Sequence, residues 1–131
     1  MPYLNLSYAA PEALPVAELA ATLTGLTVDL LGKKESLTVV RMDRTPSDQW
    51  FIGGQALGAG QSGAVLEIRV TEGTNTKVQK AAYLRAVFEV LSANFRDLHP
   101  ASYVSIHELP ADAWGYGGET QEYRFIRGIS L

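Results

Sequence analysis

Apolar and polar side chains alternate over residues 3–8 (YLNLSY), a pattern typical of a short β-strand. Beyond Pro11 and Pro15, apolar residues recur at helical spacing: Val16, Leu19, Ala20, Leu23, Leu26, Leu30 and Leu31. Gly32 and two lysines follow this stripe, as expected where a helix ends. Residues 37–42 (LTVVRM) have a β-branched centre, Thr-Val-Val, and they predict a second strand.

The same order returns from residue 64. Residues 64–70 (AVLEIRV) alternate as a strand, and residues 72–76 (EGTNT) supply a turn and a helix cap. A second helical face follows: Val78, Ala81, Ala82, Leu84, Val87, Phe88, Leu91 and Phe95. Residues 101–108 then predict another strand. Helical crossovers of this length favour parallel pairing within each strand-helix-strand unit.

A short sequence motif occurs near the end of each unit. TPSDQWFIGGQ (45–55) and LPADAWGYGGE (109–119) align without a gap, so Trp50 meets Trp114 and the two Gly-Gly pairs coincide. We therefore predict one α+β domain over residues 1–131, with internal repeats at 1–57 and 64–131 and a linker at 58–63. The duplicated β-α-β units would form a four-stranded sheet with two helices on one face. The glycines would give the repeated turn its backbone freedom.

The second face of this sheet would be bare. The predicted strands carry many apolar residues: Val39, Leu66, Ile68, Val70, Val104 and Ile106. We expect this to be too much apolar surface for a sheet with one face in water. Self-association would then cover it.

Composition narrows the function classes. The chain has 131 residues, a net charge of −3 and no cysteine, which argues against nucleic acid or membrane partners and excludes thiol catalysis. No signal peptide or membrane span is predicted, so we expect a cytoplasmic protein. His99 and His107 show no metal-ligand spacing, and no metal or cofactor is expected.

One motif is discounted on context. Residues 58–63 (GAGQSG) match the dinucleotide-binding pattern GxGxxG, which requires a preceding strand and a helix immediately after it. Here a strand follows, so the segment is interpreted as a linker.

Pro2 is the candidate for chemistry. Removal of Met1 would leave a secondary amine at the start of the first strand. An α-amine has a pKa of about 8, and burial or nearby cations lower it towards the value that a general base needs. The second unit has Ala64 at about the matching position, so only the first unit can build this base.

MPYLNL, the duplicated units and the two Trp-x-x-Gly-Gly phrases together resemble the tautomerase superfamily, whose members use an N-terminal proline freed of methionine. The second unit is similar to 4-oxalocrotonate tautomerase over almost its full length. This resemblance implies the tautomerase/MIF-like fold, and for chains of two such units it implies a homotrimer.

Individual positions depart from that branch. Where that branch has its first carboxylate-binding arginine, this chain has Thr74 in the second unit and approximately Glu12 in the first. Its strand arginine corresponds to Val39 and Tyr103. The arginine pair of the dehalogenase and decarboxylase branches is also replaced, by Thr71 and Glu72. The macrophage migration inhibitory factor branch matches better, through its lysine at Lys33 and its pocket tyrosine at Tyr103.

The resemblance implies a working site. Pro2 would be the base, Lys33 and Arg41 would bind a carboxylate or oxyanion, Tyr103 from a neighbouring chain would donate a hydrogen bond, and Trp50 would form an apolar wall. The expected function is tautomerisation of small 2-keto or enol carboxylic acids. Two alternatives stay open: a non-catalytic trimeric binding module, and a hydrolytic dehalogenase or decarboxylase of three-carbon acids.

Overall fold

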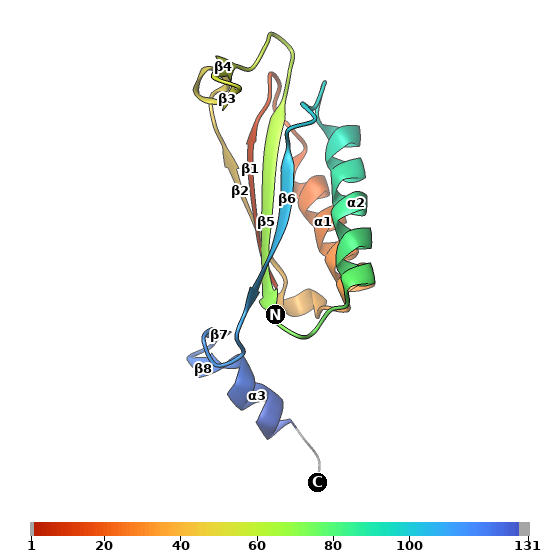
Figure 1. The fold of residues 1–131 in the computed structure, drawn as a ribbon, viewed down its shortest axis with the longest axis vertical. Coiled ribbons are helices and arrows are strands. Elements are labelled where there is room, and N and C mark those ends of the chain that lie inside the picture. The colour runs from red at the N-terminus through yellow and green to blue at the C-terminus, as the bar shows by residue number, and fades with distance from the viewer. Residues whose placement is uncertain (1, 129–131) are drawn as a thin grey trace.

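The computed structural model describes residues 2–128. A four-stranded sheet carries two long helices on one face (Figure 1). The first unit consists of β1 (Tyr3–Ala9), α1 (Val16–Leu31) and β2 (Val39–Arg44). The second consists of β5 (Gly63–Thr71), α2 (Lys77–Asn94) and β6 (Tyr103–Leu109).

The sheet has the strand order β2-β1-β5-β6. β1 pairs in parallel with β2, and β5 pairs in parallel with β6, as the crossover lengths predict. The central pair β1 and β5 runs antiparallel, with Tyr3 opposite Arg69 and Ala9 opposite Gly63. The two β-α-β units are therefore related by an approximate twofold, and the start of β1 lies at the same end of the sheet as the end of β5.

The helix boundaries follow from local chemistry. α1 ends at Gly32, whose φ of 67° is the left-handed conformation that glycine adopts freely. α2 begins after Thr76 with a capping box, in which the Thr76 side chain and Gln79 satisfy each other's backbone N–H groups. Both ends agree with the signals in the sequence.

The core lies between the sheet and the two helices. The buried strand residues alternate along each central strand, for example Leu4 and Leu6 on β1 and Leu66 and Ile68 on β5. The helices contribute Leu19, Leu23, Leu31, Tyr83, Val87 and Leu91.

Within this core the two helices share one hydrogen bond. The Thr27 hydroxyl donates to the Leu23 carbonyl at 2.8 Å, so its oxygen accepts from the Tyr83 hydroxyl at 2.9 Å. This bond and the packing around it fix α1 against α2.

The expectation of a bare apolar face was wrong. Leu66, Ile68 and Val70 are fully buried against the helices, and Val104 and Ile106 pack on the same core. Side chains alternate along a strand, so the polar residues between these apolar ones point to the face of the sheet that the helices do not cover, called here the open face. These include the pairs Arg41–Asp43 at 3.4 Å and Arg69–Glu67 at 4.0 Å. Among the six apolar strand residues that the sequence analysis named, only Val39 is exposed, with 51% of its surface accessible.

Each repeated Trp-x-x-Gly-Gly phrase forms a small hairpin. The first joins β3 (Phe51–Ile52) to β4 (Gln55–Ala56), and the second joins β7 (Gly115–Tyr116) to β8 (Glu119–Thr120). All four glycines at the two tips have positive φ, between 61° and 81°, which confirms their role in backbone freedom.

The chain continues past β8 into a short helix, α3 (Gln121–Arg127), that the sequence analysis did not predict. Hairpin β7–β8 and α3 form an arm that projects from the end of the sheet (Figure 1). Three large apolar side chains of the arm are exposed, namely Tyr123, Phe125 and Ile126. No helix within residues 2–128 has the length and apolar character to cross a membrane.

Candidate active site

Pro2 lies at the end of the sheet where β1 and β2 begin. Its carbonyl accepts a hydrogen bond from the Val39 N–H at 3.2 Å, and its ring is fully buried. The side chain points to the helix layer, in step with Leu4 and Leu6. Met1, whose removal the sequence analysis expects, lies outside the described residues. An amine at this position would be partly desolvated, and desolvation lowers the pKa of an amine.

Lys33 lies at the same end. Because α1 runs antiparallel to β1 and β2, its carboxyl end returns to the level at which both strands start (Figure 1). Lys33 Nζ donates to Thr74 Oγ1 at 2.8 Å, in the turn that follows β5. Burial lowers the pKa of Lys33, and the charge of Glu108 partly opposes that shift. The lysine is therefore a cation held in a partly dry setting, where an anion would bind it more strongly than in water.

A hollow of about 490 Å³ opens beside Lys33. Its walls come from the turn after β5, at Thr71, Glu72, Gly73 and Thr74, and from the arm, at Ala111, Gln121, Glu122 and Phe125. Its size suits a small organic acid.

Arg41 lies on the open face of the sheet. Its guanidinium is 3.4 Å from Asp43. A hydrogen bond with Tyr3, followed by the charge of Asp43, raises the pKa of Arg41. Within one chain the Arg41 side chain and the Pro2 ring are therefore on opposite faces of the sheet.

Tyr103 and Trp50 lie at the other end of the sheet from Pro2. Tyr103 pairs with Val65, and Val65 pairs in turn with Ser7 of β1. The Tyr103 side chain is 68% exposed. Trp50 packs on Gly63, where an added Cβ would be 2.6 Å from its Nε1. The five predicted residues thus divide into Pro2 and Lys33 at one end, Tyr103 and Trp50 at the other, and Arg41 on the open face.

The tryptophan beside the start of β1 is Trp114, which the sequence analysis did not select. Its Nε1 donates to Thr71 Oγ1 at 3.1 Å, and with Tyr3, Arg69 and Gly115 it lines a hollow of about 390 Å³. The signal that could have found it is the repeat itself. When the central strands run antiparallel, the turn of the second unit reaches the start of the first.

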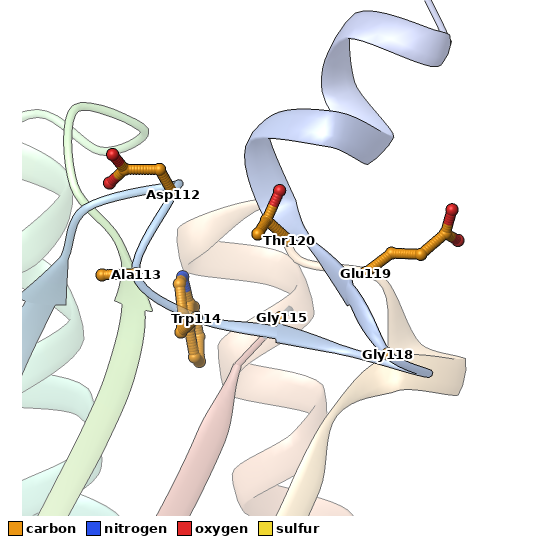
Figure 2. A pocket seen from close by; sticks show the side chains of 7 residues that line it. All are labelled: Asp112, Ala113, Trp114, Gly115, Gly118, Glu119 and Thr120. Atoms are coloured by element: carbon orange, nitrogen blue, oxygen red, sulfur yellow. The ribbon is translucent and has the colours of Figure 1, made fainter.

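A further hollow, of about 320 Å³, lies in the second hairpin. Figure 2 shows the carboxylates of Asp112 and Glu119 on opposite sides of Thr120. Glu119 is already paired with Arg124 at 3.2 Å and with Arg127 at 3.0 Å. This hollow therefore does not bring two free carboxylates together for acid-base chemistry. In the described part of the chain, no three His, Cys, Asp or Glu side chains are placed to hold a metal ion.

Comparisons with known proteins agree with this architecture. A family model described as "Tautomerase enzyme" matches residues 65–123. None of the curated proteins matches the chain.

Among solved structures, native fused 4-OT is 26% identical, with a TM-score of 0.77 over 92% of this chain and 97% of that one. The F6 fused 4-OT, described as an asymmetric trimer, is 24% identical, with a TM-score of 0.76 over 92% and 98% of the two chains. Macrophage migration inhibitory factor from Oncomelania hupensis is 14% identical, with a TM-score of 0.75 over 98% and 99%.

These matches confirm the resemblance drawn from the sequence. The family model covers the second unit, and the fold matches extend over more than nine-tenths of the chain. Residues 65–123 thus match the tautomerase family, and the chain has the fold of fused 4-OT and of macrophage migration inhibitory factor.

Proposed function

We propose that the chain is a cofactor-independent tautomerase that uses the Pro2 amine, freed by removal of Met1, as its general base. The observation that carries the proposal is that Pro2 and Lys33 lie at the same end of the sheet, where a hollow of about 490 Å³ opens beside Lys33. The substrates would be small 2-keto or enol carboxylic acids. The tautomerase family match supports this class of activity.

In this proposal the neutral amine takes a proton from the carbon α or vinylogous to the substrate carbonyl. The electron pair of the C–H bond moves into the enolate, and the ammonium returns the proton at another atom. Lys33 binds the carboxylate or the developing oxyanion, where partial burial strengthens the attraction. Arg41 remains a candidate second cation.

We also propose that the working form is a homotrimer. Tyr103 and Trp50 are too far along the sheet to join Pro2 of their own chain, so a complete site would take them from a neighbour. The exposed apolar side chains of the arm, Tyr123, Phe125 and Ile126, offer a surface for that contact. The description of the F6 fused 4-OT neighbour as a trimer supports this arrangement.

Light scattering of the purified protein tests the assembly. We expect three chain masses for the wild type and a smaller species for Phe125→Glu, which places a charge on the arm. A wild-type protein that stays at one chain mass at micromolar concentration would contradict the trimer.

The activity itself is tested with the enol of phenylpyruvate and with 2-hydroxymuconate. Untagged protein should convert the enol to the keto form without added metal or cofactor, and its intact mass should lack one methionine. Retained methionine together with no conversion would favour the binding module instead. Release of halide or carbon dioxide from a three-carbon acid, without enol turnover, would favour the dehalogenase or decarboxylase.

A further inference from the structure

The second unit shows what surrounds the position that corresponds to Pro2. The Ala64 N–H donates to Ser102 Oγ at 3.1 Å, and this bond is buried. It forms where β5 begins, just before the regular pairing with β6 starts. The side chain of Ser102 thereby takes the place of a main-chain partner for the Ala64 N–H.

The strand registers identify the equivalent pair in the first unit. Tyr3 pairs with Val39 in the first unit as Val65 pairs with Tyr103 in the second. One residue earlier on each strand, Pro2 corresponds to Ala64, and Thr38 corresponds to Ser102. The first unit therefore also has a hydroxyl side chain at the position that receives the first nitrogen of the central strand.

Two observations orient these groups. The Val39 N–H donates to the Pro2 carbonyl at 3.2 Å. In an extended strand the nitrogen and the carbonyl of one residue point to the same side, so the Pro2 nitrogen also faces β2. The Thr38 hydroxyl donates its single hydrogen to the Lys34 carbonyl at 2.9 Å. Its oxygen is left with lone pairs only, so towards Pro2 it can act solely as an acceptor.

We propose that Thr38 is a positioning residue for the Pro2 base: its hydroxyl oxygen accepts the N–H of the freed amine and so directs the nitrogen lone pair to the substrate. This inference rests on the proposed function. A neutral proline amine has one N–H and one lone pair, so an acceptor that fixes the N–H also fixes the direction of the lone pair. The lone pair then forms the new N–H bond to the substrate proton, and no other reactant is needed.

The same contact has a consequence for titration. Hydrogen bonds from charged donors are about twice as strong as those from neutral ones, so Thr38 stabilises the ammonium more than the amine. A Thr38 variant leaves unchanged the ionisable side chains of the segments next to Pro2, namely Tyr3, Lys33, Lys34, Glu35, Arg41 and Arg69. A change in the titration of Pro2 would therefore report on the hydroxyl.

The test uses Thr38→Val, with Thr38→Ser as the conservative variant and Ser102→Ala as the matched control in the second unit. In Met1-free protein labelled with ¹⁵N-proline, the pKa of the Pro2 amine is followed by NMR, and kcat is measured against pH. We expect Thr38→Val to lower the pKa of Pro2 by about one unit and kcat about tenfold, with KM changed less than about twofold. Thr38→Ser and Ser102→Ala should keep the wild-type titration.

An unchanged Pro2 titration and pH profile in Thr38→Val would overturn the inference. Thr38→Ala gives the same readout if the valine side chain disturbs the strand. The experiments distinguish failure of the two proposals. Full enol turnover in Pro2→Ala would contradict the proposed function. The NMR titration of Thr38→Val would still test the hydrogen bond from the Pro2 amine to Thr38. Loss of turnover in Pro2→Ala with no shift in Thr38→Val would remove this inference alone.

Discussion

The buried hydrogen bond between the helices makes a quantitative prediction for Tyr83→Phe. The substitution removes the phenol donor but keeps the ring, so no cavity forms, and the Thr27 hydroxyl still donates to the Leu23 carbonyl at 2.8 Å. We expect a loss of about 1 kcal/mol in the free energy of unfolding at pH 7. Thr27→Val should cost more, about 1–3 kcal/mol, because it leaves the buried Tyr83 hydroxyl without an acceptor.

The pH dependence adds a sharper test. Burial raises the pKa of Tyr83 to about 12, opposed in part by the hydrogen bond with Thr27. Because the folded pKa lies above the unfolded value of about 10, this stabilisation is complete below pH 10 and is lost as the pH rises towards 12. At pH 11 the wild type should have lost about 1.4 kcal/mol that Tyr83→Phe does not lose.

Urea unfolding at pH 7, 9 and 11, at one fixed protein concentration, measures both effects. The stability curves of the wild type and Tyr83→Phe should meet near pH 11, and the double variant with Thr27→Val should cost less than the sum of its parts. A difference between wild type and Tyr83→Phe that stays constant from pH 7 to pH 11 would refute the reasoning.

Two further predictions concern the site and the first hairpin. Lys33→Met should raise KM for a carboxylate substrate about tenfold or more. In the wild type, KM should also rise as the pH passes the lowered pKa of Lys33, because the cation is present only below that pKa; steady-state kinetics that show neither effect would argue against Lys33 as the anion partner. Gly63→Ala should destabilise the fold by about 1–3 kcal/mol, because its Cβ would be 2.6 Å from Trp50 Nε1. Gly58→Ala, whose Cβ has 3.7 Å of space, is the control, and equal melting temperatures for the two variants would contradict this packing.

Much of the fold could be predicted because its signals are local. The alternation over β1, the apolar stripe that ends at Gly32 and the cap at Thr76 each depend on neighbouring residues. The repeated turn phrase then gave the duplication. The helix α3 was missed although its signal is also local, since Thr120 caps it by accepting from the Tyr123 N–H at 3.0 Å.

The arrangement of side chains around the site depended on strand order, which the sequence analysis did not fix. Leu66, Ile68 and Val70 recur every second residue, so they share one face, and the helices take that face. The sequence analysis counted the apolar strand residues without considering this alternation, and it therefore assigned them to the uncovered face of the sheet. Similarly, antiparallel pairing of β1 with β5 is what brings Trp114, and not Trp50, to the start of β1 in one chain.

The central claim is that the Pro2 amine performs the chemistry, and the rate of enol-to-keto conversion in Pro2→Ala tests it most directly. Alanine also permits removal of Met1 but replaces the rigid secondary amine with a flexible primary one. With Pro11→Ala as an exposed control, kcat/KM should fall at least about 100-fold in Pro2→Ala and stay at the wild-type value in the control. A Pro2→Ala protein that lacks Met1 and works within about twofold of the wild type would contradict the account.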